Sequence, residues 1–283
     1  MRPADWSEAW ARFAAGRGAR LALLIVLALI ALALVGPAFS PHEGAALDWR
    51  SIAAAPGLSS RHWFGTDRLG RDLFVRTLEG ARVSLAVGAV ASAVSIVIGL
   101  GYGAIAGYAG GRTDRLMMRF IEILSGLPLI FFVIFVTVLF GRNEVLLFVA
   151  IGAVGWLTLA RIVRGQTLSV RRREFIEAAI VSGASGARII VRHVLPNVAS
   201  PAIVYASLAV PQIILLESFL SFLGLGIQEP RASLGTLIAE GAGELQSAPW
   251  MLLVPGTYLT LLLLSLNLLG DGLRDAFDVG ERA

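Results

Sequence analysis

The sequence has no cysteine and no lysine, and it has three histidines among its 283 residues. Without cysteine, the chain can form no disulfide bond and no thiolate metal site, and it cannot perform thiol catalysis. Without lysine, it cannot build a phosphate-binding loop of the GxxxxGK[ST] type, so we expect that it does not hydrolyse ATP by itself. His42, His62 and His193 are scattered along the sequence, and we therefore expect no metal site.

Charged residues are also scarce, at 16% of the chain against 56% hydrophobic residues, and the mean hydropathy is +0.75. Soluble domains usually carry about 25% charged residues, so this composition indicates a membrane protein. The isoelectric point of about 10.3 could suggest a nucleic-acid partner. Arginines that flank membrane spans explain the basic balance more simply, so we expect no nucleic acid.

Six apolar stretches approach or exceed the length of about 20 residues that a membrane-crossing helix needs. The predicted spans are Leu21–Phe39, Leu85–Tyr108, Leu116–Phe140, Val145–Ala160, Pro201–Leu225 and Trp250–Leu269. We expect the first stretch to be a retained span and not a cleaved signal peptide, because no small-residue cleavage site follows it. The chain is therefore predicted to be an all-α integral membrane protein with both ends on the same side.

The arginines indicate which side that is, since positively charged residues favour cytoplasmic loops. With a cytoplasmic N-terminus, sixteen of the 24 arginines lie on the cytoplasmic side. Six of the other eight lie in the long loop between the first two spans, from Arg50 to Arg82, where acidic residues nearly balance them. We therefore predict a multi-pass protein of the inner (plasma) membrane with both termini in the cytoplasm.

A polar segment, "FIEAAIVSGASGARIIVRHVLPN" at 175–197, interrupts the apolar runs between the fourth and fifth predicted spans. We expect one short helix over 171–180, a bend near Gly183, and a second helix over 187–194 that Pro196 stops. Such a hairpin cannot bury much of its own surface, so it could be a docking surface for another protein. A solvated loop with incidental helicity is the alternative.

The hairpin resembles the EAA signature of the permeases of ABC importers. The matching residues are Glu177, Ala178 and Ala179, then Gly183 four residues later, and finally Leu195 with Pro196, whereas His193 stands where the signature usually has isoleucine. "RHVLPN" is similar to the dipeptide, oligopeptide and nickel branch of that family. Three further stretches resemble the C-type permease subunit of this branch: "FGTDRLGRDLFVRTLEGARVSL", "ESFLSFLGLGIQEPRASLGTLIAEG" and "NLLGDGLRDAFD".

This resemblance implies the fold of a type I ABC importer permease, with six transmembrane helices and a cytoplasmic coupling hairpin between helices four and five. It divides the chain into an N-terminal part (1–83) with the first helix and a long extracytoplasmic loop, a permease core (84–273) and a cytoplasmic tail (274–283). The signature residues in the hairpin would couple the permease to an ATPase. The implied cargo is a di- or oligopeptide, and the alternative is nickel or another small solute.

The same resemblance implies a heteromeric machine in a lipid bilayer. The partners would be a second permease subunit, two ATP-hydrolysing subunits and an extracytoplasmic substrate-binding protein. ATP and Mg²⁺ would bind the ATP-hydrolysing partners, so that this chain would carry no cofactor and no catalytic residue of its own.

Further polar residues allow more than one interpretation. Glu217 lies within the fifth span, where a charge is costly, so it could face the translocation path or hydrogen-bond another helix. Gln228 and Glu240 lie in the following outside loop and could belong to an outer gate, a binding-protein contact or a solvated connector. Arg119 and Glu122, three residues apart, are expected to form a local ion pair.

A ridge of four glycines, Gly99, Gly103, Gly107 and Gly111, is expected to let helices pack closely, and a direct role in the pore is the alternative.

Two other classes of function have to be weighed. "GASG" at 183–186, with His193 downstream, resembles the serine motif of rhomboid intramembrane proteases. However, Ser185 lies among arginines in a predicted cytoplasmic loop, with no third orienting group evident. A stand-alone channel is the other alternative, but the predicted spans contain neither a selectivity-filter sequence nor a ring of charge.

Overall fold

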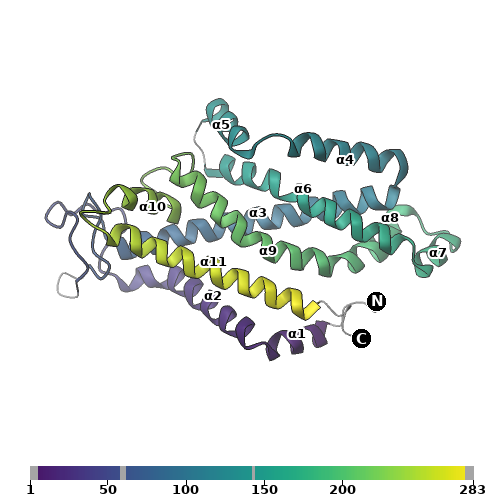
Figure 1. The fold of residues 1–283 in the computed structure, drawn as a ribbon, viewed down its shortest axis with the longest axis horizontal. Helices are drawn as coiled ribbons and strands as arrows, with labels where there is room; N and C mark the ends of the chain where they lie inside the picture. Colours follow the sequence, from purple (N-terminus) through teal and green to yellow (C-terminus); the bar gives the residue numbers. More distant parts are fainter. Residues whose placement is uncertain (1–5, 58–61, 142–143, 278–283) are drawn as a thin grey trace.

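A computed structural model describes residues 6–57, 62–141 and 144–277, and these residues form a bundle of long helices (Figure 1). The elements in chain order are α1 (Trp6–Ala15), α2 (Arg17–Val35), η1 (Gly36–Phe39), α3 (Leu73–Ala109), α4 (Gly111–Ser125), α5 (Leu129–Phe140), α6 (Glu144–Arg171), α7 (Glu174–Val181), α8 (Gly186–Ile189), η2 (Ile190–Val194), α9 (Leu195–Phe222), α10 (Leu234–Gly243) and α11 (Trp250–Phe277). No named strand occurs among the described residues, so the predicted all-α class is confirmed.

Four helical segments are long and apolar enough to cross a membrane: Arg17–Phe39, Leu73–Ala109, Gly186–Phe222 and Trp250–Phe277. A fifth crossing results if α4 and the following helix count as one bent span. The predicted fourth span corresponds to α6, a helix of 28 residues that runs beside α3. Six spans remain a prediction on this basis.

The predicted third span differs most from the structure. Instead of one helix over 116–140, α4 and the following helix meet at an angle of 82°. Gly126 and Pro128 lie at the break, where Pro128 has an extended backbone and caps α5. Proline lacks a backbone N–H and restricts the residue before it, so an apolar run that contains it need not form a single helix.

The second span begins twelve residues earlier than the sequence predicts. The Asp72 carboxylate accepts a hydrogen bond from the backbone N–H of Val75 at 2.9 Å and thereby caps the N-terminus of α3. The first turns of α3, from Leu73 to Leu78, are almost completely buried within the protein. The start of α3 is thus covered by loops and by α10.

Three of the four ridge glycines pack α3 against α6. A Cβ atom would lie 2.9 Å from the Leu159 side chain if added at Gly99, 2.5 Å from the Ala160 carbonyl oxygen at Gly103, and 2.7 Å from Thr167 at Gly107. The packing interpretation of these glycines is therefore confirmed. Gly111 differs, because it has open space around it and a φ of +58°, and it begins α4 instead.

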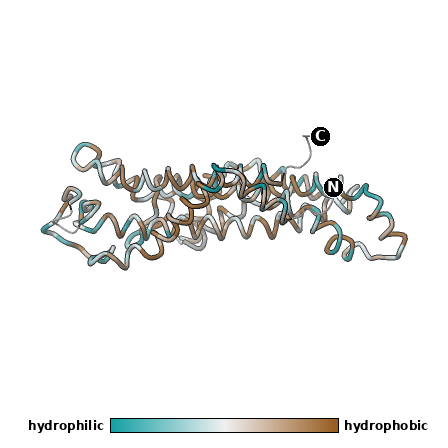
Figure 2. Tube along the Cα trace, turned by 90° about the horizontal axis from the view of Figure 1, so that it is seen from below, coloured by the Kyte–Doolittle hydropathy of each residue, from teal (hydrophilic) through white to brown (hydrophobic). Residues whose placement is uncertain are grey.

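Polar and apolar residues occupy different parts of the bundle. Figure 2 shows hydrophobic residues along most of the length of the long helices, with hydrophilic residues gathered in the loops at both ends. One end holds α1, the C-terminal end of α11 and the short helices α7 and α8, whereas the other end holds α10 and the loop before α3 (Figure 1). We call these the hairpin end and the loop end of the bundle.

Candidate functional site

The hairpin between α6 and α9 is helical on both sides of a bend, as predicted, but its second arm does not end where expected. Instead of stopping at Pro196, the chain passes from α8 through the π-helical turn η2 directly into α9. The N–H of Leu195 bonds to the carbonyl oxygen of Ile190, five residues back. Pro196, which has no backbone N–H to donate, comes directly after this π-helical turn. The second arm of the hairpin is therefore the beginning of a long helix.

The signature residues of the first arm lie on an exposed surface. Glu177 and Ala178 are exposed, and Ala179 is half-buried. Gly183 has a φ of +78° with no neighbour near its Cβ position, so a glycine satisfies the left-handed backbone and leaves the surface open. Beside these residues, Val181 exposes 89% of its area, which is unusual for a large apolar side chain.

The opposite face of the hairpin is packed firmly onto the bundle. Ile176 and Ile189 are fully buried in one apolar cluster with Val163 of α6 and Val198 of α9. Leu195 packs half-buried against the same cluster. A force applied to the exposed face would therefore be transmitted to α6 and α9 through close-packed side chains.

A polar contact connects the hairpin end of α6 to α4. The guanidinium of Arg164 donates two hydrogen bonds to the carboxylate of Asp114, at 2.5 and 2.6 Å. Arg119 and Glu122 form the predicted ion pair on α4 at 3.5 Å, but both side chains are mostly exposed. The first contact fixes two helices, whereas the second contributes little to stability.

At the loop end, the stretch "GTDRLGRD" folds into a buried ion-pair network. Asp67 is completely buried, and its Oδ2 atom accepts hydrogen bonds from Arg71 at 2.6 Å and from Arg76 at 2.5 Å. Arg76 also donates two hydrogen bonds to Glu240 of α10, at 2.7 and 3.2 Å, and Arg71 donates one to Glu229 at 3.0 Å. Glu240 is therefore one member of a structural clamp between α3, α10 and the loops.

The buried ion-pair network changes the pKa of the Arg71 guanidinium. Burial lowers the pKa of its guanidinium, but the hydrogen bonds to Asp67 and then to Glu229 outweigh burial and raise the pKa above its usual value. Arg71 therefore remains charged at every physiological pH.

Glu217 is fully buried between helices. Its carboxylate accepts hydrogen bonds from Ser84 of α3 at 2.8 Å and from Ser221 of α9 at 2.7 Å, with Ser218 at 3.4 Å. Of the two interpretations of Glu217, these contacts support the hydrogen bond between helices. Gln228 donates a hydrogen bond from Nε2 to the carbonyl oxygen of Gly226 at 2.9 Å, within its own loop.

A cavity of about 170 Å³ lies between α3, α6 and α9. Its polar lining comes from small or uncharged residues, namely Ser92, Ser95, Thr158, Tyr205 and Gln212. The hydroxyls of Ser92 and Ser95 are buried without a hydrogen-bond partner in the described part of the chain. Sequence reasoning missed these residues, although two serines three positions apart in an apolar span are a usable signal, because they share one helix face.

The residues of the protease alternative are not arranged for catalysis. The Oγ atom of Ser185 accepts a hydrogen bond from the N–H of Arg188 and caps α8. The His193 ring lies 6.3 Å from the Phe175 ring, measured between centroids. Within the described ranges, no hydrogen bond joins Ser185 to His193.

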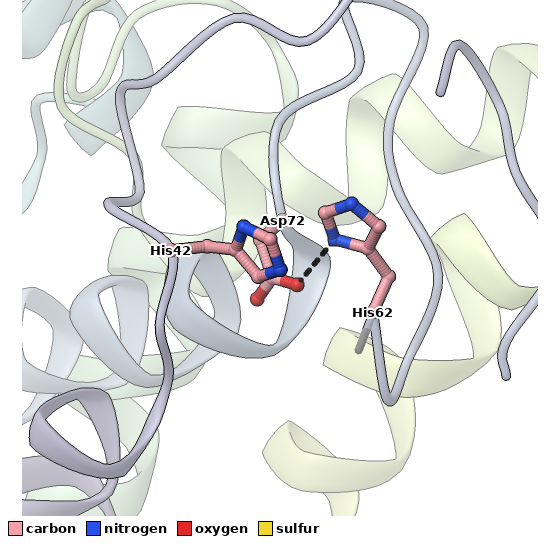
Figure 3. A group of neighbouring side chains, drawn as sticks. All are labelled: His42, His62 and Asp72. Atoms are coloured by element: carbon pink, nitrogen blue, oxygen red, sulfur yellow. Dashed lines mark hydrogen bonds and ion pairs between the residues drawn. The ribbon is translucent and has the colours of Figure 1, made fainter. Parts of the chain in front are cut away.

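Two of the three histidines lie next to each other in the structure, although they are scattered in the sequence. His42 and His62 stack with ring centroids 4.1 Å apart, and His62 Nδ1 lies 2.8 Å from Asp72 Oδ2 (Figure 3). Twenty positions of sequence separate the two rings, but the loop folds back over the start of α3. Separation in sequence therefore did not exclude a shared site.

The sequence of the chain matches a known family of membrane components. The family model described as "Binding-protein-dependent transport system inner membrane component" matches residues 99–282. The chain belongs to this family. A second model, "N-terminal TM domain of oligopeptide transport permease C", matches residues 5–56 of this family member.

Curated relatives in the same family match over almost the whole chain. "Oligopeptide transport system permease protein OppC" of Haemophilus influenzae is 52% identical over 277 residues, covering 98% of this chain and 89% of the relative. The protein of the same description from Escherichia coli K12 is 51% identical, covering 98% and 92%. "Dipeptide transport system permease protein DppC" of Bacillus subtilis is 44% identical, covering 96% and 84%. The resemblance to C-type permease subunits is thereby confirmed, and the family is one of transport components, not of proteases.

Proposed function

We propose that this chain is a permease subunit that carries di- or oligopeptides inward as part of an ATP-driven importer. The observation that carries the cargo assignment is the near-complete coverage by relatives described as oligopeptide and dipeptide permeases. The proposed machine contains a second permease subunit, two ATPases that bind ATP and Mg²⁺, and an extracytoplasmic binding protein. Nickel or another small solute is the alternative cargo.

In this proposal the chain crosses the inner membrane six times, with α4 and α5 as one bent span and α6 as the next. The hairpin end and both termini then face the cytoplasm. The arginine distribution supports this orientation, and the position of α1, α7 and the end of α11 at one end of the bundle agrees with it (Figure 1).

The exposed face of α7 is the proposed contact with an ATPase. Glu177 and Ala178 lie there beside the exposed Val181, and Gly183 leaves the bend open to a close approach. Because Ile176 and Ile189 anchor the other face, movement of the ATPase would displace α6 and α9 together. The hairpin would thus convert hydrolysis on a partner into rearrangement of the helices that line the cavity.

For the path itself, we propose the cavity lined by Ser92, Ser95, Thr158 and Gln212. Uncharged hydroxyl and amide groups can exchange hydrogen bonds with the peptide backbone, which every peptide cargo shares, without selecting one side chain. We place Glu240 and Gln228 at the outer gate, where rearrangement of the Arg76–Glu240 clamp could accompany opening. Alternating access would then proceed without covalent chemistry.

Peptide uptake and ATP hydrolysis by the complete importer test the coupling assignment. Glu177→Ala and Gly183→Leu should each reduce uptake of a labelled oligopeptide and substrate-stimulated ATP hydrolysis at matched membrane levels. Glu8→Ala, a change of the same type at an exposed position of α1, outside the hairpin, should leave both within about twofold, as surface substitutions generally do. Ser185→Ala should also retain transport. Normal coupling in both Glu177→Ala and Gly183→Leu would contradict the assignment.

Uptake measurements with different solutes test the cargo assignment separately. Cells that produce the complete importer should accumulate a labelled oligopeptide, and unlabelled peptides should compete with it. Saturable uptake of radiolabelled nickel with no uptake of any peptide would overturn the peptide assignment and leave the coupling assignment standing.

A further inference from the structure

His42, His62 and Asp72 bring three metal-binding groups together at the loop end of the bundle. One ligand atom from each residue lies within 4.8 Å of the others. His62 and Asp72 are almost completely buried, at 4% and 2% exposure, and His42 is half-buried. Figure 3 shows both imidazole rings beside the Asp72 carboxylate, His42 from the loop after η1 and His62 from the approach to α3.

The hydrogen bonds of this cluster do not account for the Nε2 atom of His42. It is buried and has no hydrogen-bond partner in the described part of the chain. Burial of a polar nitrogen without a partner is costly, so it is rare in folded proteins unless a water or an ion satisfies the atom. The other polar contact of this residue is made by its backbone N–H, which bonds to Ser40 Oγ at 3.2 Å.

We propose that His42, His62 and Asp72 bind a divalent transition-metal ion of the zinc class. Two imidazoles and one carboxylate form a donor set that suits Zn²⁺ and its neighbours, whereas Mg²⁺ and Ca²⁺ prefer oxygen ligands alone. Three protein ligands leave one position of a tetrahedral shell for water. The absence of cysteine from the chain removes thiolate competitors for the ion.

Binding of a metal ion would require small movements of the three side chains. Ligand atoms in a tetrahedral zinc site with bonds of about 2.0–2.2 Å lie roughly 3.3–3.5 Å from each other. The pair of His62 Nδ1 and Asp72 Oδ2 is closer than this, at 2.8 Å, because a proton joins the two atoms. The metal would replace that proton and release it to solvent, and rotation of the half-buried His42 ring would complete the set.

The residues around the site leave the Asp72 carboxylate available to a metal ion and favour the binding of a cation. The nearby guanidiniums of Arg71 and Arg76 are paired with Asp67, Glu229 and Glu240, so they do not neutralise Asp72. The other Asp72 oxygen, Oδ1, caps α3 and holds the carboxylate in place. In addition, the Glu79 carboxylate packs against Gly44, two residues after His42.

A metal at this position would tie the loop after η1 to the first turn of α3. That turn also carries Arg76, which forms the clamp with Glu240 of α10. The site does not include residues of the cavity between α3, α6 and α9. We therefore assign the ion a structural role at the loop end, separate from the cargo path.

Zinc binding by the full-length chain tests this inference, and the purification uses a streptavidin-binding tag because a polyhistidine tag would bind zinc. After removal of metal with a chelator, titration with Zn²⁺ against a chromophoric competitor measures affinity and stoichiometry. The wild-type chain should bind one Zn²⁺ with micromolar or tighter affinity. His42→Gln and His62→Gln should each weaken binding about tenfold or more, because even residues that only orient metal ligands contribute 10–100-fold.

His193→Gln is the matched control, since it removes the remaining histidine at the hairpin end and should not change zinc affinity. Zn²⁺ should raise the melting temperature of the wild type and of His193→Gln but not that of His42→Gln. A cooperative melting transition of each metal-free variant shows that the variant folds. If His62→Gln does not fold, because His62 is buried, the zinc affinity of His42→Gln alone decides the test. Absence of stoichiometric binding to the wild type, or wild-type affinity in His42→Gln, would overturn the proposal.

Discussion

The carboxylate of Glu217 in α9 accepts a hydrogen bond from the hydroxyl of Ser84 in α3 at 2.8 Å, and both residues are completely buried. The same Ser84 hydroxyl lies 3.4 Å from the backbone N–H of Leu234, at the start of α10. One acidic side chain and one hydroxyl thus connect three helices. An acidic residue in an apolar helix need not mark a transport path if polar partners from its neighbours surround it.

Replacement of Glu217 should therefore affect stability more than transport. Glu217→Ala removes the acceptor of Ser84 and Ser221, and each buried hydroxyl left without a partner costs about 1–3 kcal/mol. Glu217→Gln keeps an acceptor oxygen and the side-chain volume, so it should retain most of the stability. Thermal unfolding in detergent measures the difference. A stable Glu217→Gln protein that has lost peptide uptake would instead place Glu217 on the path.

Gly103 should be the least tolerant position of the glycine ridge. In Gly103→Ala the new methyl group would lie 2.5 Å from the carbonyl oxygen of Ala160, so α3 and α6 must separate, at a cost of roughly 1–3 kcal/mol. Gly101→Ala, in the same helix, meets open space and should be neutral or stabilising. Melting temperatures of the two variants compare a packed with an unpacked glycine. Equal temperatures would show that α3 and α6 do not pack in this way.

The buried ion pair of Arg76 and the exposed ion pair of Arg119 should differ greatly in how much they contribute to the stability of the folded chain. Arg76→Ala leaves Asp67 buried and partly unpaired, and the loss of one partner of a buried pair costs about 3–5 kcal/mol. Arg119→Ala breaks an exposed pair whose side chains are 76% and 61% accessible, and it should cost well under about 1 kcal/mol. Expression level and thermal unfolding of both variants are the measurements. A folded Arg76→Ala chain as stable as Arg119→Ala would contradict the clamp at the loop end.

Thiol labelling can test the orientation without background, because the chain has no native cysteine. Ala187→Cys, exposed on the hairpin, should be protected from a membrane-impermeant thiol reagent in intact cells and react after denaturation. Gln246→Cys, exposed between α10 and α11, should react in intact cells. The opposite pattern would place the hairpin outside the cytoplasm and contradict the coupling proposal.

Much of the fold and of the candidate site follows from local sequence properties. Apolar runs identify α2, α3, α9 and α11, because a bilayer requires long hydrophobic helices whatever their arrangement. The glycines of α3 predict close packing, because the missing side chain is itself the cause. The motifs around Glu177 and "GTDRLGRD" predict the family correctly. The division of the chain at residues 83 and 273, and the roles of the hairpin residues, remain predictions.

Contacts between distant segments could be decided only by the tertiary structure. The sequence determined that this is a helical membrane protein without a lysine-dependent phosphate loop, since composition and apolar length act locally. It did not determine that Arg76 pairs with both Asp67 and Glu240, that serines surround Glu217, or that His42 meets His62 over Asp72. The energy of a buried charge or ring depends on which atoms surround it, and those atoms come from other parts of the chain.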